Sequence, residues 1–295
     1  MPPVRLLTLL CGAAVTSCLT ALAGPATAAV PAPASSAETS SAETSSVETR
    51  SAEARPVEGS AALGSTVAAH EGRTPTARPS ATTLAAGTTV RGLDVSHWQG
   101  TVDWPSVRAE GARFTYMKAT EGTGYTDPQF RANYTGSYAA GLVRGAYHFA
   151  LPDRSSGRAQ ADFFVDHGGG WSADGRTLPP LLDIEYDPYG PTCYGLTPAA
   201  MVRWVRDFSD QVKARTGRSP ALYTTANWWT TCTGDATGIA RTDPLFVARY
   251  SSAVGTLPAG WTRWRFWQFA DSGTFPGDQD LFQGTMTQLR AFATG

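Results

Sequence analysis

From about residue 88 onward, short apolar runs rich in β-branched residues alternate with stretches of helical periodicity. Seven runs read as strands, at 90–95, 114–119, 143–149, 181–186, 221–225, 245–250 and 265–269, and 280–282 is a candidate eighth. Strands that alternate with helices are typically parallel and joined by crossovers. The pattern therefore predicts an α/β fold, a (β/α) barrel of about eight strands that is similar to a TIM barrel.

Three of the intervening stretches carry helix signals. The clearest starts with Thr197 and Pro198, a capping residue followed by proline at the first helical position, and ends at Gly217. Its apolar residues recur on one helix face, at 201, 204, 205, 208 and 212. The other two helices are expected after Pro128 and over about 156–166. Helical periodicity is weak between 223 and 282, so we expect the barrel to be irregular in its final third.

The first 86 residues have a different composition. Residues 1–29 combine a positive start, an apolar run and a small-x-small pattern at 26–28, which is typical of a secretory signal peptide. Residues 30–86 repeat Ser, Ala, Glu and Thr and contain almost no large apolar side chains, which predicts a disordered spacer or pro-segment. The catalytic domain would then be 87–295, in a protein secreted to the extracellular space.

Cysteine usage and charge narrow the list of partners. Cys11 and Cys18 lie in the signal peptide, and Cys193 and Cys232 remain as an even pair that predicts a disulfide in an oxidising compartment. The formal net charge is only −1, so no nucleic-acid partner is expected. After the signal peptide no apolar stretch approaches the length of a membrane helix, so we expect no membrane association. We expect a monomer. We also expect no metal and no cofactor, because the sequence lacks metal-ligand spacings and phosphate-binding glycine loops.

The candidate chemistry lies at the carboxyl ends of the strands, where such barrels place their catalytic groups. Asp183 and Glu185 are two residues apart on one strand, so they share a face, roughly 6.5 Å apart along the backbone. Two neighbouring carboxylates repel each other, so the pKa of one should rise until it can serve as a general acid near neutral pH. The alternative is that both carboxylates merely end a strand in water. Asp94, which ends another strand, and the aromatic residues at neighbouring strand ends favour the catalytic interpretation.

Several residues at strand ends are candidate sugar contacts. Aromatic side chains there are typical of a sugar-binding mouth, although core packing is expected to account for about half of them. The candidates are Tyr147, Tyr223, Trp267, Gln268 and Glu121. His97 and His148 are further candidate acids or bases, and no serine or cysteine lies in a known nucleophile motif.

The same strand ends resemble the glycoside hydrolase family 25 lysozymes. The matching motifs follow the order and spacing of that family and cover nearly all of residues 90–290. They are 92–100 (GLDVSHWQG), 102–104 (VDW), 118–122 (KATEG), 145–149 (GAYHF), 183–185 (DIE), 222–225 (LYTT) and 267–268 (WQ). The cysteine pair and the long leader resemble the Chalaropsis-type members, the N,O-diacetylmuramidases.

The resemblance implies a fold, a reaction and residue roles. The fold would be an irregular β/α barrel with fewer helices than strands. The reaction would be hydrolysis of the β-1,4 bond from N-acetylmuramic acid to N-acetylglucosamine in bacterial peptidoglycan, including O-acetylated glycan. Glu185 would be the acid, Asp183 its partner and Asp94 a supporting carboxylate. Asp280 matches a family aspartate near the last strand, with Asp278 as its close neighbour.

Other interpretations of the same residues stay open at this point. A chitinase-like hydrolase on the same barrel would also use an Asp-x-Glu pair beside a 2-acetamido group. A non-catalytic glycan-binding protein would keep the aromatic lining and dispense with the carboxylates. Within the lysozyme hypothesis, Asp183 could orient the substrate acetamido group as that group attacks, or act as the nucleophile itself. A third route has an aspartate activating water.

Overall fold

The structure is a computed structural model that describes residues 58–73 and 89–295. The expected signal peptide, with Cys11 and Cys18, lies outside the described residues. So does most of the expected spacer. The described residues belong to one compact unit of the chain.

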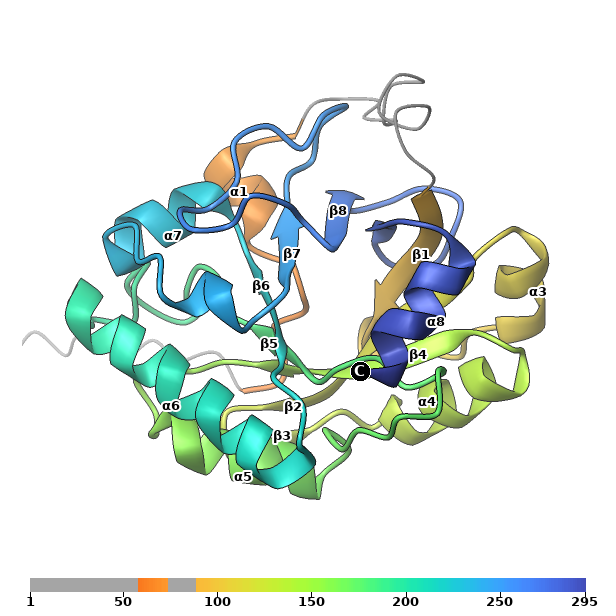
Figure 1. Cartoon of the computed structure of the whole chain (residues 1–295), viewed down its shortest axis with the longest axis horizontal. Coiled ribbons are helices and arrows are strands. Elements are labelled where there is room, and N and C mark those ends of the chain that lie inside the picture. The colour runs from red at the N-terminus through yellow and green to blue at the C-terminus, as the bar shows by residue number, and fades with distance from the viewer. Residues whose placement is uncertain (1–57, 74–88) are drawn as a thin grey trace, which may run out of the picture. The chain divides into compact units, whose positions relative to one another are not determined.

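The strands form a closed, mixed barrel (Figure 1). A nine-stranded sheet runs in the order β1-β9-β8-β7-β6-β5-β4-β2-β3, and an additional pairing of β1 with β2 closes eight of the strands into the barrel. These eight are β1 (Thr89–Val95), β2 (Phe114–Glu121), β4 (Val143–Phe149), β5 (Leu181–Asp183), β6 (Ala221–Thr224), β7 (Leu245–Ala248), β8 (Phe266–Ala270) and β9 (Gln279–Gln283). The short β3 (Tyr125–Thr126) extends β2 as a hairpin. The predicted barrel and its eight strands are confirmed.

One strand departs from the expected parallel arrangement. β1 and β2 pair in parallel, as do all neighbours from β2 through β4 to β8. β9 instead runs antiparallel to both β8 and β1. A parallel return needs a long crossover, usually a helix, and the loop from β8 to β9 contains none. The irregularity expected for the final third of the barrel lies at this strand.

Helices cover only part of the barrel. The three predicted helices are confirmed as α4 (Phe130–Ala139), α5 (Gly157–Asp166) and α6 (Pro198–Thr216). Thr197 caps α6 by accepting from the backbone of Ala200, and Gly217 ends it in the left-handed conformation. The other helices among the described residues are α1 (Val67–Glu71), α3 (Trp104–Ala109), α7 (Ala226–Thr233), α8 (Met286–Thr294) and the 3-10 turns η1 (His97–Gln99) and η2 (Ile239–Arg241). No helix in the described ranges has both the length and the apolar character needed to cross a membrane.

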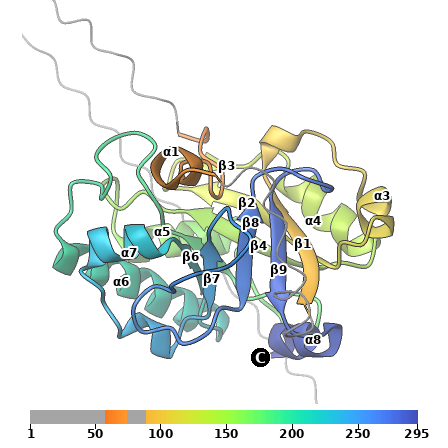
Figure 2. The ribbon, with the colours of Figure 1, turned by 90° about the horizontal axis from the view of Figure 1, so that it is seen from above.

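The alternation of side chains along the strands creates two apolar layers. Inside the barrel lie large aromatic side chains with at most 1% exposure: Phe114, Tyr116, Tyr147, Tyr223, Phe246, Phe266 and Phe282. Leu289 and Ala293 of α8 join this cluster, and Figure 2 shows α8 at the end where β1 begins. The outer layer contains Leu182 and Ile184, packed with residues of α5 and α6. Leu181 faces inward while Leu182 and Ile184 face the helices, as strand alternation predicts.

The predicted disulfide is present between Cys193 and Cys232, across a sequence separation of 39. It ties the loop after β5 to α7. Replacing both cysteines with serine is expected to lower the free energy of unfolding by about 3–4 kcal/mol, because the bridge limits the conformations of the unfolded chain. Denaturant unfolding would measure this loss, and activity below the transition should match the parent. Labelling of both thiols in the native protein would contradict the bridge.

Residues 58–73 lie in the range that we expected to be a disordered spacer, and here they have a defined conformation. Ala61, Leu63 and Val67 are at most 2% exposed. Leu63 and Val67 belong to the aromatic cluster inside the barrel. The composition argument considered only the core that the segment could form by itself. Its few apolar residues are buried against the barrel instead.

Candidate active site

Five polar side chains meet at one end of the barrel interior. Asp94 and Asp183 lie at the carboxyl ends of β1 and β5, and Glu185 follows two residues later. Gln268 on β8 lies beside Asp280 on β9, whose register also places it beside Gly92. Asp94 is the most exposed of the five at 3%. The strand ends named by the sequence therefore converge.

Glu185 has both carboxylate oxygens engaged. Oε1 accepts from the backbone N–H of Gly64 at 2.7 Å, and Oε2 accepts from the hydroxyl of Thr66 at 2.6 Å. Burial raises the pKa of Glu185 to about 8, although these hydrogen bonds act in the opposite direction. A carboxyl group with such a pKa is largely protonated at neutral pH, which is what a general acid requires.

Asp183 is fully buried, and neither of its oxygens has a hydrogen-bond partner among the described residues. Burial raises its pKa well above the usual range, and the charges of Glu185 and Asp94 add to the effect. We expected repulsion between the pair to raise one pKa. The pKa values of both Asp183 and Glu185 are raised, and desolvation is the largest cause for each. An unpartnered buried carboxyl group is costly and typical of a functional site.

Gln268 organises the other carboxylates. Its amide nitrogen donates to Asp94 at 2.9 Å and to Asp278 at 2.7 Å. Its amide oxygen accepts from the hydroxyls of Tyr223 at 2.7 Å and Tyr250 at 3.0 Å. These four contacts fix the orientation of the amide.

Asp94 and Asp280 are two further buried carboxyl groups at this end of the barrel. Burial raises the pKa of Asp94 to about 7, and its hydrogen bond with Gln268 acts to lower it. Burial and the charges of Asp94 and Asp278 hold the pKa of Asp280 well above its usual range. Neither oxygen of Asp280 has a hydrogen-bond partner among the described residues. This end of the barrel is therefore a cluster of acidic groups whose charged forms are disfavoured by desolvation.

Three of the candidate sugar contacts lie near the carboxylates, and Glu121 lies in a separate ion pair. Tyr147, Tyr223 and Gln268 face the interior near the carboxylates, and burial raises the pKa of Tyr147 with added effects of Asp94 and Asp183. Glu121 forms a buried ion pair with Lys118 and accepts from Tyr189 at 2.5 Å.

Trp267 and His148 lie elsewhere. Trp267 packs in the outer layer, 6.0 Å from Trp264 between ring centroids, because it neighbours the inward-facing Gln268 on the same strand. Its side chain therefore lies on the opposite face of the strand from the carboxylates. His148 is buried beside Gln160 of α5, and burial lowers its pKa to about 3.

Sequence reasoning missed Tyr250 and gave Asp278 too little weight. Tyr250 ends the apolar run at 245–250, which is the same signal that identified Tyr147 and Tyr223. Asp278 immediately precedes β9 and is held by Gln268. Tyr250 would follow from applying the strand-end rule to every run. Asp278 would not, because it lies at the start of β9, which reaches this end of the barrel only because it runs antiparallel.

Within residues 58–73 and 89–295, no three His, Cys, Asp or Glu side chains are grouped so that they could hold a metal ion.

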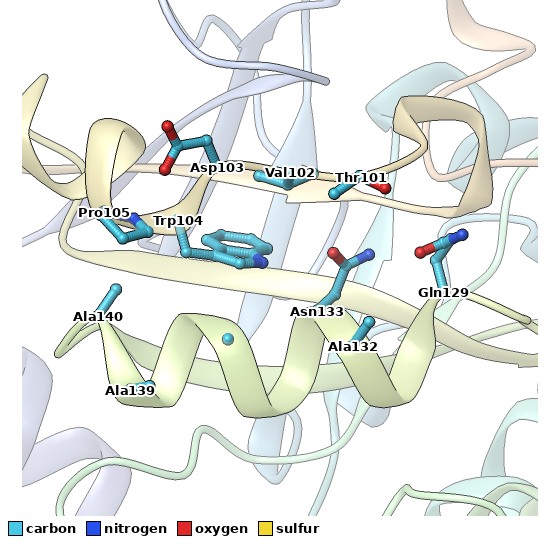
Figure 3. A pocket seen from close by; sticks show the side chains of 11 residues that line it. Thr101, Val102, Asp103, Trp104, Pro105, Gln129, Ala132, Asn133, Ala139 and Ala140 are labelled. Atoms are coloured by element: carbon cyan, nitrogen blue, oxygen red, sulfur yellow. The ribbon is translucent and has the colours of Figure 1, made fainter.

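A groove of about 480 Å³ lies between α3 and α4, away from these carboxylates (Figure 3). It is bordered by Trp104 and by small residues of α4, and it contains none of the carboxylates described above.

The buried acids predict how stability depends on pH. The pKa values of Asp94 and Glu185 are higher in the folded chain than their usual 3.8 and 4.5, so the folded state binds more protons between about pH 4 and 8. Their stabilising contribution is thus full below about pH 4 and is lost as the pH rises through about 7 to 8. We expect the free energy of unfolding to fall by at least about 2 kcal/mol from pH 5 to pH 8, since one pKa unit corresponds to about 1.4 kcal/mol.

Denaturant unfolding at the two pH values measures this slope. Asp280→Asn should reduce it, because the variant removes one buried acid. Asp210→Asn, the same change at an exposed position of α6, should leave it unchanged. Equal stability of the parent at pH 5 and pH 8 would contradict the prediction.

The sequence matches a known enzyme family over most of the barrel. The family model described as Glycosyl hydrolases family 25 matches residues 93–278. The chain is 51% identical over 209 residues to Lysozyme M1 of Streptomyces globisporus, covering 69% of this chain and 71% of that protein. It is 46% identical over 211 residues to the N,O-diacetylmuramidase of Chalaropsis sp, covering 70% of this chain and all of that protein.

A solved structure of the same family has a similar fold. The family GH25 lysozyme from Aspergillus fumigatus superposes with a TM-score of 0.70 at 51% identity, covering 70% of this chain and 100% of that one. The irregular barrel described above is thus similar to that of a solved enzyme.

Proposed function

The chain belongs to glycosyl hydrolase family 25, and from this premise we propose that it is a lysozyme acting on bacterial peptidoglycan. The bond hydrolysed would be the β-1,4 bond from N-acetylmuramic acid to N-acetylglucosamine. The names of relatives at about half identity, a lysozyme and an N,O-diacetylmuramidase, support this substrate and the inclusion of O-acetylated glycan. The signal-like residues 1–29 support export to the compartment where peptidoglycan lies.

The observation that carries the proposal is the neutral acid at the barrel mouth. Burial by the barrel and by residues 58–73 raises the pKa of Glu185 to about 8. With glycan excluding water in place of that segment, Glu185 would protonate the oxygen of the leaving sugar. Asp183 would accept a hydrogen bond from the acetamido N–H of the substrate, since its own oxygens have no partner in the described residues. Asp94, Asp278 and Asp280 would line the acidic end of the site. Gln268 would orient Asp94 and Asp278 by donating a hydrogen bond to each of them.

Digestion of purified peptidoglycan tests the reaction. We expect mass spectrometry to find muropeptides that carry N-acetylmuramic acid at the new reducing end, from both O-acetylated and de-O-acetylated sacculi. Glu185→Gln is the matched inactive control. Release of N-acetylglucosamine reducing ends would contradict the assigned bond.

The chitinase-like alternative is tested with the same preparations. A lysozyme should not release reducing ends from chitin, which lacks the lactyl group of muramic acid. Hydrolysis of chitin at a comparable rate would favour the alternative.

A further inference from the structure

The ordered segment 58–73 covers the proposed catalytic acid. The backbone N–H of Gly64 and the hydroxyl of Thr66 donate to the two different oxygens of Glu185. A leaving-group oxygen would have to approach one of these same atoms. With the segment in this position, the proton of Glu185 has no path to a glycosidic bond.

Peptide groups of the segment also engage the candidate sugar contacts. Leu63 N–H donates to Tyr147 at 3.2 Å, and Gly64 C=O accepts from Tyr250 at 3.0 Å. Farther along the cleft, Gly59 N–H donates to Glu121 at 2.8 Å. An acetamido group presents the same N–H and C=O as a peptide group, so these contacts are ones that an N-acetylated glycan could make.

The ammonium group of Lys118 and the indole of Trp98 also donate to carbonyl oxygens of the segment. Lys118 donates to Ala61 and, at 3.4 Å, to Gly59. Trp98, which remains 61% exposed, donates to the carbonyl oxygen of Ser60 at 3.0 Å. An exposed tryptophan at the rim of a cleft is a typical stacking surface for a sugar ring.

The C-terminal part of the segment is held at the rim. His70 stacks on Tyr186 with ring centroids 4.0 Å apart, and Glu71 accepts from the hydroxyl of Tyr186 at 2.7 Å. Arg73 pairs with Asp271 at 2.5 Å.

The hollow left beside Asp94 measures about 270 Å³ and is partly lined by the segment. It is smaller than the roughly 300–1,000 Å³ of most ligand sites.

We propose that residues 58–73 are an internal inhibitor that occupies the glycan cleft with peptide groups in place of acetamido groups. The chain becomes active when this segment leaves the cleft. Residues 74–88 tether the segment to the barrel, which keeps its local concentration high. The inference rests on the proposed function, because it assigns the covered cleft to glycan hydrolysis.

The barrel is expected to fold without the segment. The Aspergillus fumigatus lysozyme structure is matched over its full length by 70% of this chain, which is the share that residues 89–295 make up. The Chalaropsis enzyme is likewise matched in full. The segment thus adds to a domain that is complete in these relatives.

The first test compares the chain without its signal peptide (residues 30–295) with the barrel alone (89–295). We expect the longer form to hydrolyse peptidoglycan at least about tenfold more slowly, because only the uncovered fraction of molecules is competent. Equal rates would overturn the proposal.

Two glycine variants of the longer form separate cleft binding from backbone effects. Gly64 has φ +77, and a Cβ there would lie 2.4 Å from both Gln268 Oε1 and the Tyr250 hydroxyl. Gly72 has φ +75, and a Cβ there would meet nothing within 4 Å. Alanine therefore brings similar backbone strain at both positions but a clash with the cleft only at Gly64.

We expect Gly64→Ala to raise the rate of the longer form towards that of the barrel alone. Gly72→Ala should leave the rate close to that of the parent. Neither variant changes a residue of the barrel. Activation by both variants to the same extent, or by neither, would overturn the proposal.

A synthetic peptide of residues 58–73 supplies a readout that is independent of turnover. We expect it to bind the 89–295 barrel, as measured by calorimetry, and to inhibit hydrolysis. The Gly64→Ala peptide should bind at least about tenfold more weakly, and the Gly72→Ala peptide should bind like the parent. A barrel that binds the peptide but cuts no peptidoglycan would contradict the proposed function and support occupancy of the cleft. An active barrel that does not bind the peptide would contradict the inhibitor.

Discussion

Glu185→Gln is expected to slow peptidoglycan hydrolysis by the 89–295 barrel at least about 10²-fold. The amide keeps the size and shape of the side chain but has no acidic proton, and a positioned general acid contributes typically 10²–10⁴ to the rate. Binding of glycan should persist, because the hydrogen-bonding shape of the site is retained. Initial rates on purified sacculi and binding to insoluble peptidoglycan measure the two effects separately.

The barrel form is the right background for this variant. In the longer form, any activity lost at Glu185 would be confounded with cover by the segment, which touches that same carboxyl group. Glu110→Gln makes the same chemical change at an exposed position after α3 and should leave the rate unaltered. Near-normal turnover by Glu185→Gln would show that another group supplies the proton.

Asp183→Asn is expected to cause a loss of similar size, about 10² or more, for a different reason. We propose that the acetamido oxygen of the substrate attacks the reacting carbon and that Asp183 orients the acetamido N–H and stabilises the charge that develops on the group. Such substrate-assisted chemistry is known in other glycosidase families. Two buried oxygens without partners in the described residues suit this role. Asparagine keeps one acceptor but can never carry the negative charge that an ionised Asp183 would supply.

The anomer formed first by the parent barrel distinguishes the routes. The assisted route and a covalent route through Asp183 both retain configuration, whereas direct attack by water inverts it. We expect NMR to show retention and a thiazoline analogue of the acetamido intermediate to inhibit. An inverted product would eliminate the assisted route. Retention without such inhibition, with a glycosyl ester trapped on Asp183, would favour the covalent route.

Much of the fold was predictable because its signals are local. The eight strands of the barrel, α4 to α6 and the Cys193–Cys232 bridge follow from periodicity, capping residues and cysteine usage within short windows of sequence. The placement of Asp94, Asp183 and Glu185 at strand ends is also local information. In a barrel of parallel strands, neighbouring strand ends meet at one mouth, so these carboxylates converge.

Only the tertiary structure decided direction, facing and burial. β9 runs antiparallel because the loop before it is too short for a crossover. Trp267 faces outward because its neighbour Gln268 bridges the interior carboxylates. Pair repulsion is predictable from spacing, yet the pKa of Glu185 depends mainly on what excludes water from it.

The clearest limit of the sequence is the segment 58–73. Its composition correctly indicates that it cannot build a core of its own. Whether such a segment is ordered depends on apolar surface and hydrogen-bonding groups that belong to residues far away in the sequence. Glu185 lies 121 residues from Gly64, and Tyr250 lies 186 residues from it. The barrel brings these groups together at one mouth, and that surface exists only once the chain has folded.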